Sequence, residues 1–155
     1  MNNNIQVRCI DCHVFHYDDN LNPKFLILKR ASNQLYPEIW QSITGKIKQH
    51  ELAYKAAIRE FKEETGLTIK HMWTLDHVNH FFEPKMDRLN IVPIFGIESE
   101  NKNVKLSNEH SDFKWVTAEE GMEYLLWNQQ KKGLEVFHQM LSNNKKLELS
   151  KLDFK

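Results

Sequence analysis

The chain has 155 residues, enough for one domain with a real core, and its 41% hydrophobic and 27% charged content is ordinary for a globular protein. The 21 Lys and Arg residues balance the 21 Asp and Glu residues, so no net positive field favours nucleic acid or a membrane surface as partner. The N-terminal MNNNIQVR is not a signal-peptide pattern, and no apolar run is long enough to span a membrane. We therefore expect a cytoplasmic protein.

The first thirty residues predict two strands joined by a turn. β-Branched and aromatic side chains favour a strand over residues 5–17, and KFLILKR favours another over residues 24–30. Arg30, at the end of the second strand, is a candidate for binding a phosphate or a base, but a surface cation at a strand end has the same sequence. Arg8 is a further candidate substrate contact.

Cys9 and Cys12 form a lone C-x-x-C pair. A structural zinc site needs a second pair of ligands at suitable spacing. Positions three apart on a strand also point to opposite faces. We therefore predict free thiols in a reducing compartment and no disulfide.

A short strand over residues 40–45, WQSITG, leads into the most informative part of the chain. Gly45 lets the backbone approach a ligand closely, with its carbonyl available to a metal. Trp40 and Thr44 are candidate substrate contacts. For Trp40 the ordinary alternative is a core position, since aromatic residues on strands usually belong to the core.

Residues 45–67, GKIKQHELAYKAAIREFKEETGL, predict a helix that ends at Gly66. At about 100° per residue, Glu60 and Glu64 lie roughly 40° apart on one helix face, with Glu63 roughly 60° to the other side of Glu60. A separate sector carries a buried stripe, made of Tyr54, Ala57, Ile58, Phe61 and Thr65. The acidic face is either a solvated patch or a site for a hard divalent cation such as Mg²⁺, which would offset the repulsion between the carboxylates.

The same stretch fits the pattern G-x5-E-x7-R-E-U-x-E-E-x-G-U throughout, where U is a bulky apolar residue. Its fixed positions are Gly45, Glu51, Arg59, Glu60, Glu63, Glu64 and Gly66. With each residue type at roughly one in fifteen, a chance match at one starting point has a probability on the order of 10⁻⁸. This motif resembles the signature box of the Nudix hydrolases.

The resemblance implies an α/β fold, the Nudix-type α/β/α sandwich with a mixed β-sheet between helices, as a single domain over residues 1–155. It implies Mg²⁺, with Mn²⁺ as the other possibility, bound by Glu60, Glu64, Glu109 and the Gly45 carbonyl. Arg59 would orient the carboxylates together with Glu51, and either Glu63 or Glu109 would act as the base. Gly66 has a structural role in the motif.

Downstream of the box, the sequence predicts mainly strands. They span residues 67–82, 88–98 and, briefly, 104–106. Pro93 indicates an edge strand or a bulge. His77 and His80 are three apart on a strand, hence on opposite faces, which argues against a shared metal.

Glu109 opens EHSDFKWV, which resembles the stretch where many Nudix enzymes place a further glutamate near the metals; an ordinary loop acid is the alternative. A strand to Val116 follows. Thr117 is a predicted N-cap of a helix to about Trp127, and Asn128 is a predicted cap of a last helix to about Leu141. Residues 143–155 read as a weakly ordered tail.

The implied reaction is hydrolysis of a pyrophosphate bond in a nucleoside or pterin triphosphate. Residues 40–45 and 109–116 resemble the branch acting on dATP or dihydroneopterin triphosphate, which releases pyrophosphate. Alternative substrates are a dinucleoside polyphosphate, a nucleotide sugar or an RNA 5′ end. A nucleotide-sensing module would usually have lost a box carboxylate, and the box is complete here. Expected partners are the small-molecule substrate and at most a second copy of the chain, since a monomer and a homodimer both remain open.

Overall fold

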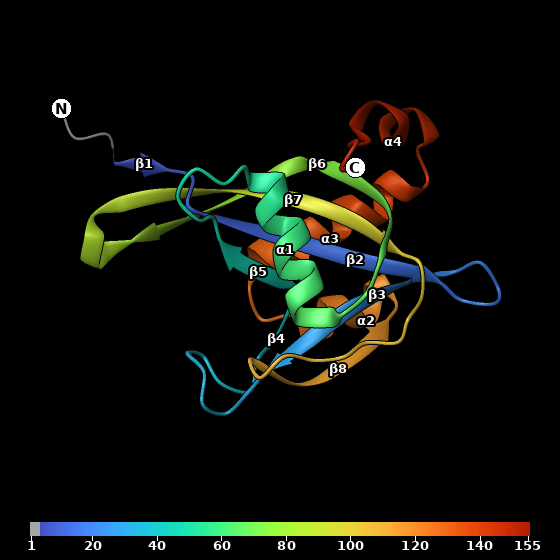
Figure 1. Ribbon diagram of the computed structural model, residues 1–155, viewed down its shortest axis with the longest axis horizontal. Helices are drawn as coiled ribbons and strands as arrows, with labels where there is room; N and C mark the ends of the chain where they lie inside the picture. Colours follow the sequence, from blue (N-terminus) through green and yellow to red (C-terminus); the bar gives the residue numbers. More distant parts are fainter. Residues whose placement is uncertain (1–3) are drawn as a thin grey trace.

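The computed structural model describes residues 4–155 as an eight-stranded mixed sheet with helices packed on both faces (Figure 1). The strands are β1 (Ile5–Gln6), β2 (Cys9–Tyr17), β3 (Pro23–Arg30), β4 (Trp40–Gln41), β5 (Ile43–Lys46), β6 (Ile69–Glu83), β7 (Arg88–Ser99) and β8 (His110–Val116). The helices are α1 (Ala53–Thr65), α2 (Ala118–Tyr124), α3 (Asn128–Leu141) and α4 (Asn144–Ser150), with a 3₁₀ turn at Pro84–Met86. The predicted α/β class with a mixed sheet is confirmed.

Strand β2 lies at the centre of the sheet. It runs parallel to β7 and antiparallel to β3 and β5. Its residues alternate between two cores: Ile10, Cys12 and Val14 pack towards α1, whereas Phe15 packs towards α2 and α3. Cys9 and Cys12 are both free, as predicted.

The strand predicted over residues 5–17 is interrupted at positions 7 and 8. Strand β1 pairs with the start of β7 at Leu89 and Asn90, and β2 pairs with β7 only from Ile94 onward. Pro93 lies between these two segments, and the register of β6 against β7 shifts just before its partner Val78. The bulge predicted for Pro93 is therefore present. As a whole β7 is not an edge strand, because it pairs with β6 on one side and with β1 and β2 on the other, but Pro93 itself lies in the gap between the β1 and β2 pairings.

The strand predicted over residues 104–106 is wrong, because these residues form a loop. Val104 and Leu106 pack against the core beneath α1, and the Lys105 N–H donates to the Thr65 carbonyl at 2.8 Å. Apolar alternation in this segment reflects a loop lying on the core. Thr117 does cap α2, by accepting from the Glu120 N–H, but α2 ends at Tyr124 and Trp127, not Asn128, occupies the N-cap position of α3.

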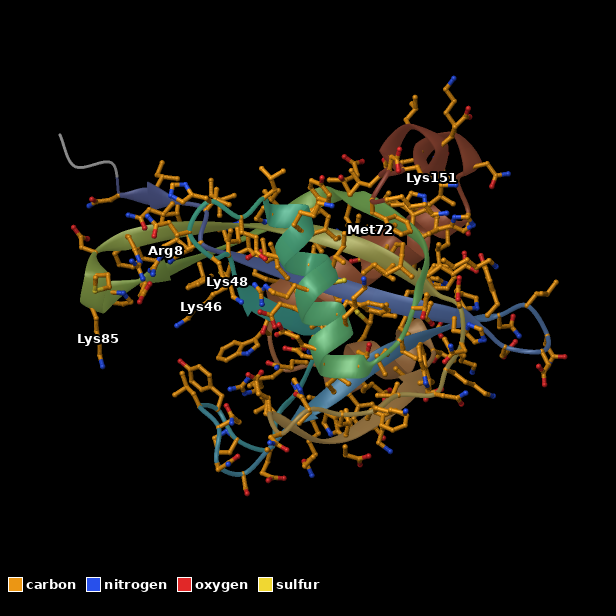
Figure 2. All side chains as sticks on the ribbon, viewed as in Figure 1. Arg8, Lys46, Lys48, Met72, Lys85 and Lys151 are labelled. Atoms are coloured by element: carbon orange, nitrogen blue, oxygen red, sulfur yellow. The ribbon has the colours of Figure 1, made fainter. Side chains whose placement is uncertain are left out.

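The weakly ordered tail predicted from residue 143 is also wrong. Asn143 caps α4 by accepting from the Lys146 N–H, and the Leu152 N–H donates to the Met72 carbonyl at 2.9 Å. Figure 2 shows Lys151 beside Met72, at the edge of β6. Lysines dominate this segment's sequence, but Leu147, Leu152 and Phe154 pack on the two cores and tie it down.

Helix α1 ends where the sequence predicted. Gly66 adopts φ 66°, a left-handed conformation that costs other residues energy, and its N–H donates to the Lys62 carbonyl. Of the predicted stripe, Ala57, Phe61 and Thr65 are buried, whereas Tyr54 and Ile58 are half-buried; Ala56 and Glu64 are buried in addition. A carboxylate on the buried face is the first unusual feature of the fold.

No helix within residues 4–155 is long and apolar enough to cross a membrane.

The packing of α3 on the sheet yields a stability prediction at Gly96. A Cβ added there would overlap the ring of Phe137, which is fully buried. We expect Gly96→Ala to destabilise the fold by roughly 1–3 kcal/mol through overpacking. Urea unfolding would measure this, with Thr74→Ala, an exposed position on the neighbouring strand β6, as control; a Gly96→Ala variant as stable as the wild type would contradict the packing described here.

Candidate functional site

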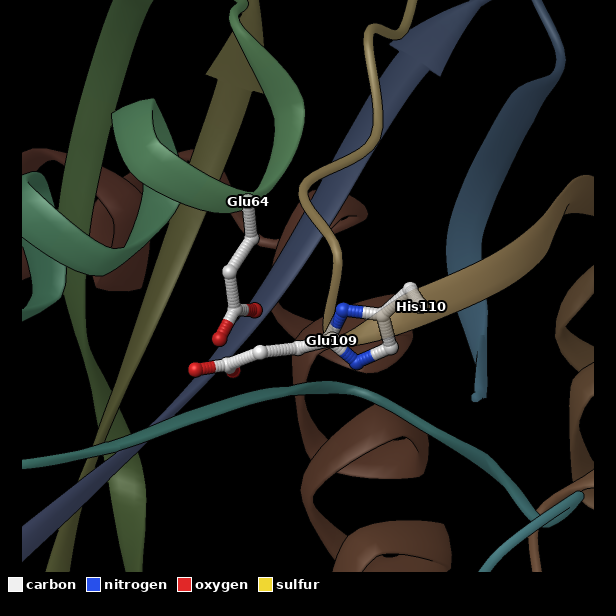
Figure 3. Close-up of side chains that lie close together, drawn as sticks. All are labelled: Glu64, Glu109 and His110. Atoms are coloured by element: carbon white, nitrogen blue, oxygen red, sulfur yellow. The ribbon is translucent and has the colours of Figure 1, made fainter. Parts of the chain in front are cut away.

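Separate segments of the chain meet at one end of α1. The helix contributes Glu60, Glu63 and Glu64, the loop before β8 contributes Glu109, and the first residue of β8 is His110. One ligand atom from each of Glu64, Glu109 and His110 lies within 4.8 Å of the others (Figure 3). The structure thus brings Glu109, predicted from a loop far along the chain, to the acidic helix.

Arg59 ties the loop before α1 to the acidic face. Its Nε and Nη2 donate to the two carboxylate oxygens of Glu51 at 2.8 and 3.0 Å, and Nη2 also donates to the Lys46 carbonyl at 2.9 Å. Its Nη1 lies 2.5 Å from Glu60 Oε1 and 3.6 Å from Glu63 Oε2. The hydrogen bonds from Arg59, followed by that from the Lys48 N–H, lower the pKa of Glu51 to about 2. Arg59 therefore positions two of the carboxylates.

Gly45 lies directly against Glu60. It sits in β5 opposite Ile10 of β2, and a Cβ added there would overlap the Glu60 carboxylate. Only glycine leaves room for this approach, which puts the β5 backbone beside the acidic face. The backbone at Gly45 does come close to another group, as predicted, but that group is the Glu60 side chain and not a ligand.

Glu64 is the least ordinary residue of the group. Glu64 is only 3% exposed, and its Oε2 has no hydrogen-bond partner within the described residues. Burial, followed by the nearby charges of Glu60 and Glu109, raises the pKa of Glu64 to about 9. A buried carboxylate with one oxygen unpartnered among the described residues, close to other carboxylates, fits a divalent cation, which would supply the missing positive charge.

The raised pKa of Glu64 predicts a pH-dependent stability in the absence of divalent cations. Because the pKa of Glu64 is about 9 in the folded state and 4.5 in the unfolded state, only the unfolded state releases this proton between these two pH values. The contribution of Glu64 to the free energy of unfolding is therefore at its highest below pH 4.5 and falls as the pH rises to about 9. In chelator, the unfolding free energy of the wild type relative to Glu64→Gln should therefore fall over this window. Urea titrations at several pH values would measure the difference, and a difference independent of pH would contradict the assignment.

His110, which lies in one group with Glu64 and Glu109, was not predicted from the sequence. It is 5% exposed, its Nε2 lies 3.2 Å from Gln41 Nε2, and its Nδ1 has no partner among residues 4–155. Burial, with a smaller effect from Arg30, lowers the pKa of His110 to about 4, so the ring is neutral. The only sequence signal was its position directly after Glu109.

Arg30 reaches the same group from the end of β3. Its backbone pairs with His110, the Ala31 N–H donates to the Glu109 carbonyl at 2.9 Å, and its Nε donates to the Leu35 carbonyl at 2.7 Å. Its positive charge opposes the rise in the pKa of Glu64 and adds to the lowering of the pKa of His110. Both alternatives for Arg30, a phosphate or base contact and a surface cation at a strand end, stay predictions.

The other predicted substrate contacts lie in different surroundings. Trp40 is half-buried and packs edge-on against Tyr124, with Lys114 Nζ 5.6 Å from its ring centroid. Thr44 is half-buried opposite Asp11. Arg8 is exposed between β1 and β2, and Figure 2 shows it on the same side of the molecule as Lys46 and Lys48.

A buried polar cluster, unnoticed in the sequence, connects the group to α3. Asp11 accepts from Ser42 Oγ, from Asn79 Nδ2 at 2.9 Å and from the Cys12 N–H at 3.0 Å. The Ser42 N–H in turn donates to Gln130 at 3.4 Å. Burial raises the pKa of Asp11 to about 6. Ser42 follows Gln41, the partner of His110, so the start of α3 is held close to the site.

Comparison with known proteins gives consistent matches. A sequence model of the NUDIX domain matches residues 12–137. The chain is 30% identical over 113 residues to dihydroneopterin triphosphate diphosphatase of Haemophilus influenzae, covering 64% of this chain and 69% of the relative. It is 26% identical over 133 residues to the asymmetrical bis(5′-nucleosyl)-tetraphosphatase of Mus musculus, covering 83% and 88%. A Listeria monocytogenes crystal structure described as a NUDIX hydrolase superposes with a TM-score of 0.75 at 25% identity, covering 90% of this chain and 97% of that one.

Proposed function

The chain belongs to the NUDIX hydrolase family, and we propose that it hydrolyses a nucleoside or pterin triphosphate to the monophosphate and pyrophosphate with Mg²⁺, or Mn²⁺, as cofactor. The observation that carries the proposal is the buried, unpartnered oxygen of Glu64 beside Glu60 and Glu109. Such a carboxylate is costly to bury unless a cation compensates it.

The cation would be held by Glu60, Glu64, Glu109 and the Gly45 carbonyl. When bound, a divalent cation neutralises charge on the polyphosphate and makes a bound water more acidic. The chain's own contribution is to fix these oxygens in advance. Arg59 holds Glu60 through a 2.5 Å contact and is itself anchored on Glu51. That arrangement keeps the ligands in place before substrate arrives.

The proton of the attacking water needs a carboxylate that is not committed elsewhere. Glu63 is exposed, and Arg59 lies 3.6 Å from it, farther than from Glu60. Glu109 is likewise exposed but lies in the group with Glu64. Both stay candidates for the base: water would attack the α-phosphorus, its proton would pass to one of them, and pyrophosphate would leave.

Arg30 would bind the phosphates from the other side of the group. Its position at the end of β3, next to His110 and Glu109, puts a fixed positive charge at the edge of the carboxylates. Trp40 and Thr44 would contact the base or pterin. Arg8 would contact a part of the substrate that lies beyond the carboxylates. These three assignments remain predictions, as do the single domain, the cytoplasmic location and the monomeric or dimeric state.

The substrate assignment is supported by the diphosphatase of Haemophilus influenzae, whose name specifies dihydroneopterin triphosphate. A dinucleoside polyphosphate is the second candidate. The match to the mouse tetraphosphatase covers more of this chain, 83% against 64%. The side of the molecule that carries Arg8, Lys46 and Lys48 would also suit additional phosphates (Figure 2).

A substrate panel tests the proposal. Dihydroneopterin triphosphate, dATP, the other nucleoside triphosphates, dinucleoside tetraphosphates, nucleotide sugars and a 5′-triphosphate RNA would be incubated with Mg²⁺ or Mn²⁺, with chelator as control. Release of pyrophosphate, with ¹⁸O from labelled water in the monophosphate, is the expected result. Nucleoside triphosphate as a product of the tetraphosphates alone would favour the second candidate, and no cation-dependent turnover of any compound would refute the proposal.

A further inference from the structure

The unpartnered nitrogen of His110 points to a role beyond the carboxylate set. His110 is 5% exposed, and within the part of the chain that the structure describes its Nδ1 has no hydrogen-bond partner. A buried ring nitrogen left without a partner costs free energy. The same ring lies within 4.8 Å of ligand oxygens of Glu64 and Glu109 (Figure 3). Two unpartnered buried atoms, His110 Nδ1 and Glu64 Oε2, therefore belong to one cluster.

Gln41 determines which ring nitrogen carries the proton. As placed, its amide Nε2 lies 3.2 Å from His110 Nε2 and can only donate to it, an orientation that would leave the ring proton on Nδ1. A metal-ligand role for Nδ1 requires the other orientation: because the two ends of a carboxamide have nearly the same shape, a half-turn of the amide would place its carbonyl oxygen against Nε2. Nε2 then carries the hydrogen and donates it to Gln41, and Nδ1 presents a lone pair to the cluster. Metal-binding histidines commonly donate their second nitrogen in this way.

We propose that His110 Nδ1 is a nitrogen ligand of the divalent cation held by Glu64 and Glu109, and that it makes the site prefer transition metals to Mg²⁺. The proposal rests on the cation site of the proposed function, and adds a ligand and a metal preference to it. Imidazole nitrogen is a better ligand for transition metals than for Mg²⁺, and divalent affinity rises from Mn²⁺ to Co²⁺. For a site with oxygen ligands alone, the affinity would rise less from Mn²⁺ to Co²⁺.

Pulsed electron paramagnetic resonance of bound Mn²⁺ tests the ligand directly, without turnover. The protein would be prepared with ordinary histidine and with ¹⁵N-histidine, each loaded with substoichiometric Mn²⁺. We expect a nitrogen modulation that changes from the ¹⁴N to the ¹⁵N pattern on labelling. Bound Mn²⁺ without nitrogen modulation would overturn this proposal and leave the proposed function standing, whereas absence of any bound Mn²⁺ would overturn both.

Calorimetry with Mg²⁺, Mn²⁺ and Co²⁺ tests the preference. His110→Gln replaces the nitrogen by an amide and is expected to weaken Co²⁺ binding most, on the order of tenfold, Mn²⁺ less and Mg²⁺ least. The matched control is His71→Gln on β6, where the ring lies 5.9 Å from that of Trp73. Equal weakening for all three ions would mean that His110 only supports the local structure, and would overturn the proposal. Because the labelling experiment uses the wild-type chain, it stands even if His110→Gln does not fold.

Discussion

Glu64→Gln is expected to reduce cation-dependent turnover by at least on the order of 10³-fold, since removing one charged ligand forfeits several kcal/mol of transition-state stabilisation. Glu64 is the only one of the three box carboxylates on α1 that is buried, and one of its oxygens lacks a partner within the described residues. The glutamine is nearly isosteric but cannot compensate a cation's charge. Initial rates with the best substrate of the panel would measure the loss.

The fold of Glu64→Gln should survive the change. With a pKa of about 9, Glu64 is already neutral near pH 7 when no cation is bound, so a neutral amide resembles its metal-free state. In chelator the variant should therefore melt at or above the wild-type temperature. Added Mg²⁺ should raise the melting temperature of the wild type and leave that of the variant unchanged. Glu123→Gln, an exposed residue of α2, is the control, and full activity in Glu64→Gln would refute the ligand assignment.

Arg59→Lys is expected to lower kcat/KM by about 10²-fold, although the positive charge is retained. The guanidinium contacts both oxygens of Glu51, the Lys46 carbonyl and Glu60 at once. An ammonium group is a point donor that cannot reproduce this bidentate geometry. Glu60 would lose its fixed position, and misplacement of a reacting group by about 1 Å can cost this much in rate.

The control for Arg59→Lys is the same substitution at Arg88. Arg88 makes a single 2.7 Å contact with Glu83 at the far end of the β6–β7 hairpin, so Arg88→Lys should leave kcat/KM within about twofold. The kcat/KM of Glu51→Gln should lie between those of Arg59→Lys and Arg88→Lys, because this change weakens the hydrogen bonds that anchor Arg59 without removing the contact from Arg59 to Glu60. Retention of full activity in Arg59→Lys would show that Arg59 does not position the acidic face.

The sequence predicted those parts of the site that lie within one short segment. Helical periodicity put Glu60 and Glu64 on one face, and the left-handed conformation at Gly66 ended the helix as expected. Glu51 and Arg59 were linked by the family pattern, and the structure contains that contact. Interactions over a few residues depend on backbone geometry that local sequence encodes.

The errors came where tertiary packing overrode local composition. Residues 104–106 alternate like a strand, but their backbone is used to cap the end of α1. The lysine-rich segment after Asn143 looked unstructured, yet Leu147, Leu152 and Phe154 find buried surface on the rest of the fold. Whether an isolated apolar residue is buried depends on surfaces that are distant in the sequence.

The amino-acid sequence by itself determined the family, the acidic helix and the class of bond to be cleaved, because a continuous motif of charged and glycine residues carries them. Only the tertiary structure decided that Glu64 is buried with one oxygen unpartnered within residues 4–155, that Glu109 and His110 lie beside it, and that Gln41 lies against His110. The physical reason is that burial raises the cost of an uncompensated charge or an empty hydrogen-bonding atom, and burial is a property of the assembled sheet and helices.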